Sequence, residues 1–212
     1  MALTFGKSQG KAAKSVDAFE IKDGDNTVRI VGDILPRYIY WIKNSEGKNV
    51  AVECLAFDRE KEKFTDNSLD KVPNYYPDLK CSWAYSIQVI EAPGTPDAKI
   101  KTFNLKKKLF QQIKTLAEDL GDPTDLDNGW DIMFKKVKTG SKAYDVEYTL
   151  QQMRCKKRPL SDAERTLVAE MKHIDQIYPR PTIEAVEKQL KSLSSGSTNA
   201  EELPEEAASE LG

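Results

Sequence analysis

The sequence predicts a mainly β protein with one helix among its strands and an α-helical segment near its C-terminal end. Three observations lead to this fold class. Short runs rich in β-branched and aromatic residues alternate with turn signals over residues 27–153, one strongly amphipathic stretch interrupts them, and helical composition resumes after residue 158. With 212 residues, the chain is long enough to bury a core in one or two domains.

The β-rich part begins with a short β-branched run at residues 27–31. Residues 37–43 have the aromatic and β-branched composition of a strand, and residues 49–57 alternate small apolar side chains on one parity. A turn signal at 44–47 separates the two runs. Together these features predict a β-hairpin.

The next feature is a long connection at 58–79, which is polar, charge-balanced and rich in turn residues. Ordered connections of this length are usually functional or mobile. Residues 81–90 then alternate apolar and polar side chains, which predicts one strand. A proline- and glycine-rich turn at 92–97 ends that strand, and residues 99–103 extend the sheet.

The clearest helix covers residues 105–120. Its apolar positions recur at spacings of four, four, three and four residues, at Leu105, Leu109, Ile113, Leu116 and Leu120. Such spacing places them in one stripe along a helix, and Gly121 is a typical helix end. Residues 130–138 and 143–153 then predict two strands around another hairpin turn.

Helical composition returns at 161–178, where Ser161 and Glu164 form a capping-box pattern, and again at 183–193. The order strand, strand, long loop, strand, helix, strand, strand is that of a five-stranded OB-fold barrel with one helix between strands 3 and 4. An α+β sandwich has the same order and stays open. The predicted domains are a flexible basic arm at 1–18, an OB-fold core at 19–158, a helical appendage at 159–194 and a disordered acidic tail at 195–212.

Charge is distributed unevenly along the chain, although the formal net charge is only −2. Residues 99–158 carry 14 Lys and Arg against 8 Asp and Glu. Each end carries charge of a single sign. The arm is basic, with Lys7, Lys11 and Lys14, and the tail is acidic, with Glu201, Glu202, Glu205, Glu206 and Glu210. A basic body with an acidic end favours a polyanionic partner, whereas a solvated surface with a solubilising tail explains the same charges.

Motifs for catalysis or cofactor binding are few. The single histidine, His173, falls in the predicted C-terminal helix with no Ser or Cys nucleophile nearby, and neither GxxxxGK[ST] nor GxGxxG occurs. Cys54, Cys81 and Cys155 lie far apart in sequence. Structural zinc ligands usually come in close pairs, so we expect no metal, no cofactor and no disulfide framework, as fits a reducing cytoplasm.

One enzymatic alternative stays open. Asp78 after a proline, followed by Asp97 and Lys99, matches the PD-(D/E)xK pattern of metal-dependent nucleases. That pattern requires its second carboxylate on a strand beside the first, whereas residues 93–97 have the composition of a turn. We therefore expect a non-enzymatic protein. No apolar run approaches the ~20 residues that span a bilayer, so no membrane partner is expected.

Aromatic and basic side chains are the remaining candidates for function. Single-stranded nucleic acid is bound by cations along its backbone and by flat side chains on which unpaired bases stack, each worth roughly 1–3 kcal/mol. Apolar strand faces build the core, so Trp83, Tyr85, Trp130 and Phe134 each have a core role as the competing interpretation. Tyr75 and Tyr76 lie in a proline-flanked polar loop with little core to join, which favours them as stacking platforms.

The segment from Cys81 to Ile113 carries SWAYSIQVIEAP at 82–93, KTF at 101–103 and a lysine-rich amphipathic helix. Together with DNTVRI at 25–30, the hairpin at 40–54 and residues 129–148, it resembles the T4-type phage single-stranded-DNA-binding proteins. This resemblance implies an OB-fold core, a basic arm that promotes cooperative self-association along DNA, and an acidic tail that contacts replication and recombination proteins. The zinc site of the T4 member is not implied, because residues 58–79 contain neither Cys nor His.

The resemblance assigns Trp83 to base stacking, and Lys80 with Tyr75 or Tyr76 to the lining of the cleft. The predicted DNA-binding residues are Trp83, Tyr75, Tyr76, Tyr40, Lys80, Lys106, Lys107, Lys108, Lys135, Lys136, Lys138 and Lys142. An ordinary solvated helix face explains Lys106–Lys108 equally well.

The predicted function is sequence-tolerant binding of single-stranded DNA in phage replication, recombination and repair, in the cytoplasm of an infected bacterial host. The alternatives are a metal-dependent nuclease that uses Asp78, Asp97 and Lys99, and a replication protein-interaction module that binds no DNA.

Overall fold

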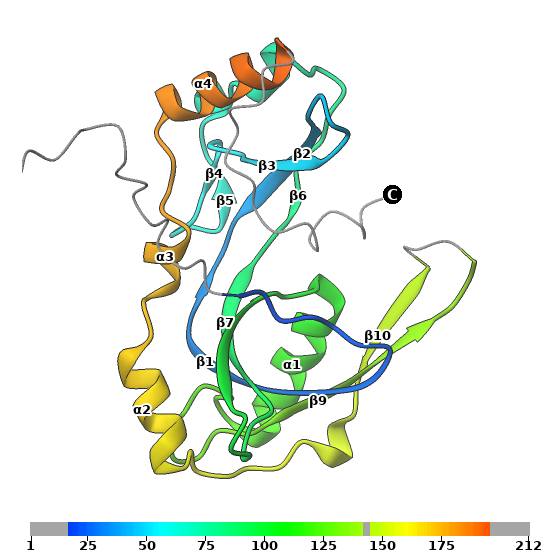
Figure 1. Cartoon of the computed structure of the whole chain (residues 1–212), viewed down its shortest axis with the longest axis vertical. Helices are drawn as coiled ribbons and strands as arrows, with labels where there is room; N and C mark the ends of the chain where they lie inside the picture. The colour runs from blue at the N-terminus through cyan, green and yellow to red at the C-terminus, as the bar shows by residue number, and fades with distance from the viewer. Residues whose placement is uncertain (1–16, 142–144, 196–212) are drawn as a thin grey trace, which may run out of the picture.

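The computed structural model describes residues 17–141 and 145–195, and this part of the chain is mainly β (Figure 1). Its strands are β1 Gly24–Leu35, β2 Tyr38–Lys43, β3 Asn49–Glu53, β4 Phe57–Asp58, β5 Lys63–Phe64, β6 Ser82–Trp83, β7 Ser86–Glu91, β8 Lys99–Asn104, β9 Ile132–Lys138 and β10 Val146–Leu150. Its helices are α1 Lys107–Leu120, α2 Asp162–Glu170, α3 Ile174–Ile177 and α4 Ile183–Ser194, with 3-10 turns at Asn67–Leu69, Val72–Asn74 and Gln152–Arg154.

The larger sheet has five antiparallel strands in the order β10-β9-β1-β7-β8. Its central strand β1 is β-branched and pairs on both sides, with Val28 opposite Glu91 of β7 and Ile132 of β9. The apolar stripe of α1 packs Leu109 and Ile113 against this sheet. The amphipathic period of α1 and the short β-branched runs therefore build one core.

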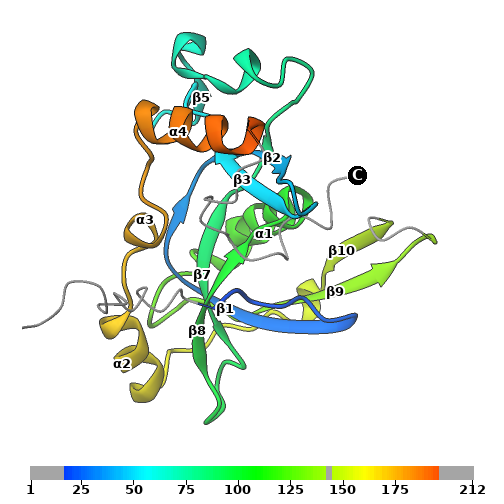
Figure 2. The same cartoon turned by 45° about the horizontal axis from the view of Figure 1, so that its top comes forward.

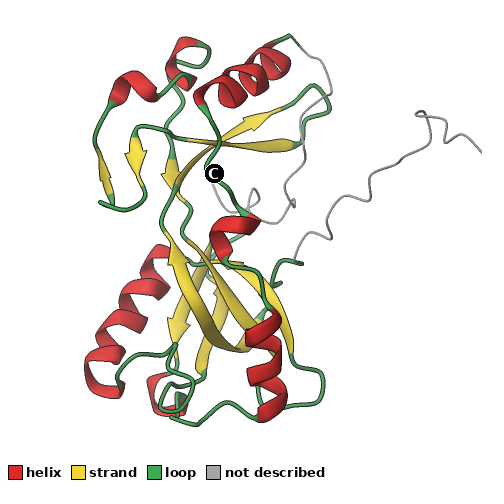
Figure 3. Cartoon of the chain, turned by 90° about the vertical axis from the view of Figure 1, so that its left-hand side faces the viewer, coloured by secondary structure: helices red, strands yellow, loops and turns green. Residues whose placement is uncertain are grey.

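A second, smaller unit is inserted between β1 and β7. It contains the three-stranded sheet β3-β2-β6 and the short hairpin β4-β5, and the helix α4 packs on it. Figures 1 and 3 show this unit at one end of the molecule and the five-stranded sheet with α1 and α2 at the other. Val50 and Val52 of β3 pack against Val186 and Leu190 of α4, so the C-terminal helix completes the core of the inserted unit.

The predicted hairpin at 37–43 and 49–57 is confirmed as β2-β3, but it lies in the three-stranded sheet. The prediction of one strand at 81–90 is wrong. The chain crosses between the sheets at Ala84 and Tyr85, so that β6 pairs with β2 whereas β7 pairs with β1 and β8. Alternation of apolar residues continues through this crossing, although β6 is half-buried and β7 is buried on both faces, so the pattern alone does not reveal the change of sheet. The segment at 99–104 is a full member of the larger sheet.

The helix predictions are confirmed in part. Helix α1 ends before Gly121, whose φ of 81° favours glycine, and α4 ends one residue beyond its predicted bound. The single helix predicted at 161–178 is wrong, because Met171 is extended and separates α2 from the one-turn α3. The connection at 58–79 also holds more structure than predicted, namely β5 and two 3-10 turns.

The inserted unit and the larger sheet meet at the segment after α3. The Arg37 guanidinium lies 4.0 Å from the centroid of the Tyr178 ring, and the Tyr178 hydroxyl donates to Thr102 Oγ1 of β8 at 3.3 Å. Arg59 of the inserted unit donates to the Tyr178 carbonyl at 3.0 Å. The view in Figure 2 shows α3 on the path of the chain between α2 and α4. The C-terminal segment thus ties the inserted unit to the larger sheet.

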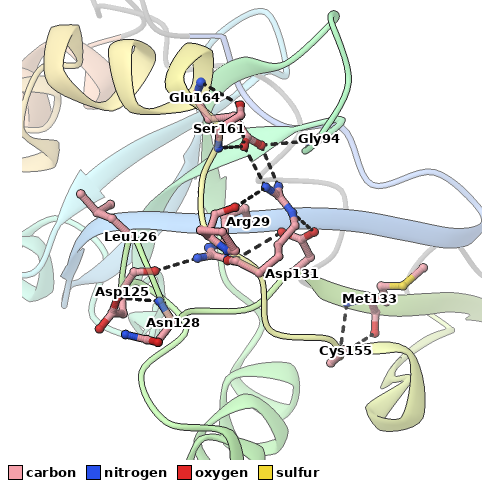
Figure 4. Close-up of polar contacts among 12 residues, drawn as sticks. Arg29, Gly94, Asp125, Leu126, Asn128, Asp131, Met133, Cys155, Ser161 and Glu164 are labelled. Atoms are coloured by element: carbon pink, nitrogen blue, oxygen red, sulfur yellow. Dashed lines mark hydrogen bonds and ion pairs between the residues drawn. The ribbon is translucent and has the colours of Figure 1, made fainter.

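A buried ion network holds α2 against the larger sheet (Figure 4). Arg29 of β1 is fully buried, donates to the Asp125 carbonyl at 2.7 Å and lies 3.6 Å from Asp131 Oδ1. Arg158 bridges Asp131 at 2.6 Å and Glu164 of α2 at 2.7 Å. Hydrogen bonds from Arg158 lower the pKa of Glu164 to about 2. Within the described ranges, no helix is both long and apolar enough to cross a membrane.

Candidate nucleic-acid interface

Six aromatic side chains gather where the inserted unit meets the larger sheet. We call them the ring cluster: Tyr38, Phe57, Phe64, Trp83, Tyr85 and Phe110. They come from β2, β4, β5, β6, the β6–β7 crossing and α1. The crossing at Ala84 and Tyr85 therefore does more than change sheets, because it brings rings of the inserted unit onto the N-terminal half of α1.

Trp83 is the centre of the ring cluster. Its ring stacks on Tyr85 with centroids 3.5 Å apart and planes 13° apart, and it contacts Phe110 at 5.7 Å. Its indole nitrogen donates to the Leu105 carbonyl at 2.9 Å, which fixes the ring orientation. The side chain is only half-buried. Trp83 is thus a partly exposed ring that stacking on Tyr85 holds in place.

Phe64 is the most exposed ring of the cluster. It is 51% exposed, lies on β5 and contacts Tyr38 at 5.0 Å and Phe57 at 5.3 Å. The exposed part of this ring is available for contact with a ligand, and the two neighbouring rings hold it in place. Phe64 is not among the predicted residues, because a single aromatic residue in a polar connection gives no periodic signal. Its position directly after Lys63 in that connection was the one signal that could have indicated it.

The short β4-β5 hairpin is anchored to the larger sheet through Tyr85. This side chain is buried, and its hydroxyl donates to Glu62 Oε2 at 2.8 Å. Burial, together with this hydrogen bond to a carboxylate, raises the pKa of Tyr85. Glu62 occupies the turn of the hairpin with φ of 50°, a left-handed conformation that few non-glycine residues adopt. The hydrogen bond therefore fixes the hairpin that carries Phe64.

Lysines of α1 lie next to these rings. Lys107 Nζ is 5.7 Å from the Trp83 centroid, and Lys114 Nζ is 5.8 Å from the Phe110 centroid. Lys107 and Lys108 are exposed, as is Lys63 beside Phe64. Lys106 lies 5.9 Å from the Tyr148 ring centroid on β10. Ammonium groups thus border the ring cluster on the α1 side, within cation–π distance of two of its rings.

Of the predicted lysines, Lys107 lies beside Trp83, whereas Lys106 lies beside Tyr148 of β10. Other predicted residues lie in different environments. Tyr40 is only 5% exposed, and its hydroxyl donates to Asp70 Oδ2 at 2.6 Å. We therefore remove Tyr40 from the candidate interface. Tyr75 and Tyr76 are half-buried and pack against the core of the inserted unit. The expectation that this loop has little core to join is wrong, because α4 and β3 supply one.

The remaining predicted lysines that the structure describes lie before β6 and on β9. Lys80 is exposed just before β6. On β9, Lys135 and Lys138 are exposed, whereas Lys136 forms an ion pair with Asp23 at 3.4 Å. Other predicted residues lie outside the described residues, namely Lys142, the arm residues Lys7, Lys11 and Lys14, and the tail residues Glu201, Glu202, Glu205, Glu206 and Glu210.

The residues of the nuclease alternative do not come together. Asp97 and Lys99 line a hollow of about 430 Å³ beside β1, and Asp78 is not among its lining residues. Across residues 17–141 and 145–195, no group of three or more His, Cys, Asp or Glu side chains is arranged to hold a metal ion. His173 is exposed at the start of α3. The described geometry therefore offers no support for a two-carboxylate metal site at these positions.

Comparisons with known proteins give one informative relationship. The chain is 32% identical over 166 residues to a protein of Escherichia phage T5 described as a "Probable ssDNA-binding protein". The match covers 72% of this chain and 61% of the phage T5 protein, so the chain spans less than two thirds of that relative. No protein-family model matches the chain, and no solved structure matches it.

Proposed function

We propose that the chain binds single-stranded DNA without sequence preference, through the ring cluster and the lysines of α1. The single observation that carries this proposal is the half-buried Trp83, stacked on Tyr85, with Lys107 beside it and the exposed Phe64 nearby. Unpaired bases expose π-faces that duplex bases hide, and every base has one, so exposed rings favour single strands without reading sequence. Lysines beside the rings neutralise the phosphates of the same strand.

Similarity to the phage T5 protein supports this proposal independently of the geometry. The matched region covers 72% of the chain, and that relative is described as a probable ssDNA-binding protein. We extend that description to this chain as a proposal, together with a role in phage replication, recombination and repair and a T4-type relationship. Contacts of the acidic tail with replication proteins, and of the basic arm with neighbouring copies on DNA, belong to the same proposal.

The strand pairing supports an OB-like barrel as the framework. In an OB-fold, oligonucleotides bind near strands 2 and 3 and at the loops between strands 1 and 2 and between strands 4 and 5. We take strands 1 to 5 of the OB-fold as β1, β7, β8, β9 and β10. Helix α1 then falls between strands 3 and 4. The inserted unit then replaces the first of these loops, which gives the ring cluster a position expected for binding. A pairing of β8 with β10 that closes the barrel does not occur among the described strands.

The test is an equilibrium titration of a labelled oligo-dT strand with the full chain at several salt concentrations. We expect the logarithm of the association constant to fall linearly with the logarithm of salt concentration, with a slope of about 0.7 for each phosphate neutralised. The variant Trp83→Ala should bind about 5- to 150-fold more weakly, the equivalent of about 1–3 kcal/mol for one stacked base. Met153→Ala is the matched control, because that side chain is 93% exposed and belongs to no ring contact.

Either of two results contradicts the proposal. Absence of oligo-dT binding by the folded chain favours a protein-interaction module. Cleavage of the strand in the presence of Mg²⁺ or Mn²⁺, abolished in Asp97→Asn, favours the nuclease alternative.

A further inference from the structure

A second aromatic ring with a lysine beside it lies close to the start of α1, outside the ring cluster. This ring is Tyr148 of β10, and Lys106 Nζ lies 5.9 Å from its centroid. The next lysine, Lys107, lies 5.7 Å from the Trp83 centroid, and the Trp83 indole donates to the carbonyl of Leu105. Consecutive residues at the start of α1 therefore contact two rings, and these rings belong to different sheets.

Hydrogen bonds from α1 hold the strand that carries Tyr148. Gln112 Nε2 donates to the Tyr148 carbonyl at 3.1 Å, and the Leu150 N–H donates to Gln112 Oε1 at 2.7 Å. Among the described strands, β10 pairs only with β9, so this side chain takes the place of a further strand at the edge of the sheet. The Tyr148 ring is half-buried and packs against the core of the larger sheet. Like Trp83, it is a fixed ring with part of its surface exposed.

The face of the β9-β10 hairpin that carries Tyr148 is also basic. Tyr148 lies opposite Lys136 of β9, so both side chains lie on one face of the hairpin. Because side chains alternate along a strand, Lys138 belongs to that face and Lys135 to the opposite one. Both of these lysines are exposed, whereas Lys136 is paired with Asp23. Figures 1 and 2 show this hairpin reaching past α1, so basic surface continues beyond the helix.

We propose that Tyr148, with Lys106 and Lys138, is a second base-stacking subsite for the same DNA strand that binds the ring cluster. This inference rests on the proposed function and extends it, because the strand then crosses the start of α1 from Trp83 to β10. At each end of that path, a ring held by the protein stacks on a base, and lysines beside the ring neutralise phosphates. Stacking reads no base edges, so the longer path is still sequence-tolerant.

The experiment titrates a labelled oligo-dT strand with the full chain and with two pairs of variants. Tyr148→Ala should bind about 5- to 150-fold more weakly than the parent chain, whereas Tyr148→Phe keeps the ring and should bind like the parent. Lys138→Ala should lower the salt slope by about 0.7, the contribution of one phosphate, and Lys135→Ala should leave the slope unchanged. Because both lysines are exposed, this second pair decides the question even if Tyr148→Ala folds poorly.

Failure of this inference and failure of the proposed function give different results. Parent-level affinity of Tyr148→Ala, or equal salt slopes for Lys138→Ala and Lys135→Ala, overturns the second subsite, although Trp83→Ala still weakens binding. A Tyr148→Phe variant as weak as Tyr148→Ala also overturns it, because the ring alone then does not explain the binding. Absence of oligo-dT binding by the folded parent chain overturns the proposed function and this inference together.

Discussion

Basic side chains in the two regions of this molecule have opposite environments. Around α2, Arg29 and Arg158 are enclosed by Asp131, Glu164 and backbone carbonyls. Beside the ring cluster, Lys107 is exposed and faces an aromatic ring. Buried guanidinium groups that are paired with protein carboxylates are not available to bind phosphates, whereas solvated ammonium groups are available. The net charge of a segment therefore says less about nucleic-acid binding than the partners of each cation.

We expect the largest effect on stability from breaking the ion network that holds α2. Replacing Glu164 by Gln removes the carboxylate that accepts two hydrogen bonds from Arg158. Breaking a buried pair by removing one partner costs about 3–5 kcal/mol, so the free energy of unfolding should fall by that amount. Urea unfolding measures the decrease. Thr166→Ala on the exposed face of α2 is the control, and an equal decrease in that variant would show that the network contributes little.

A pH titration tests the same ion network. The pKa of Glu164 is about 2 in the folded chain, below its ordinary value of 4.5. A lowered folded-state pKa gives stability that is complete above pH ~4.5 and is lost as pH falls toward ~2, with a magnitude of about 3 kcal/mol. Unfolding measured across this interval should show a steeper loss of stability for the parent chain than for Glu164→Gln. Parallel curves would mean that Glu164 keeps an ordinary pKa.

On the other side of the comparison, Phe64 should bind a base. Phe64→Ala removes an exposed ring and should weaken oligo-dT binding by about 1–3 kcal/mol. The decrease in stability should be smaller than that of a buried phenylalanine, because half of the Phe64 side chain is already in water. Fluorescence anisotropy with labelled oligo-dT measures the affinity, and Val137→Ala, another exposed apolar side chain, is the control. Equal affinity of parent and Phe64→Ala would remove the β4-β5 hairpin from the interface.

The smallest effect is expected from the lysines of α1. The double variant Lys107→Ala with Lys108→Ala should lower the salt slope of oligo-dT binding by about 0.7 for each phosphate that the variant no longer neutralises. Lys99→Ala on β8 is a matched control, because it is also exposed but lines a different hollow. A slope that falls with Lys99→Ala and not with the double variant would place the DNA on another surface.

Local patterns predicted an element well where the element forms from residues that are close together in sequence. The stripe of α1, the β2-β3 hairpin and the capping box of α2 all follow from spacing and turn residues. The crossing at Ala84 and Tyr85 was not predictable in this way, because the partner strand alone decides which sheet each half joins. That crossing also creates the ring cluster.

The candidate site was predictable only in part for the same reason. Trp83 and Lys107 were found from composition and resemblance, whereas Phe64 had no periodic signal and Tyr40 was assigned to the wrong environment. Tyr40 packs into the core of the inserted unit, where Asp70, 30 residues away in sequence, accepts its hydroxyl hydrogen bond.

The most direct test of the central claim is intrinsic fluorescence of the parent chain and of Trp83→Phe during titration with unlabelled oligo-dT. The other two tryptophans are Trp130, which is fully buried, and the half-buried Trp41. If a base stacks on residue 83, oligo-dT quenches the parent chain, and most of that quenching disappears in Trp83→Phe while affinity falls little, because phenylalanine still stacks. Equal quenching in both proteins would contradict the claim that Trp83 contacts DNA.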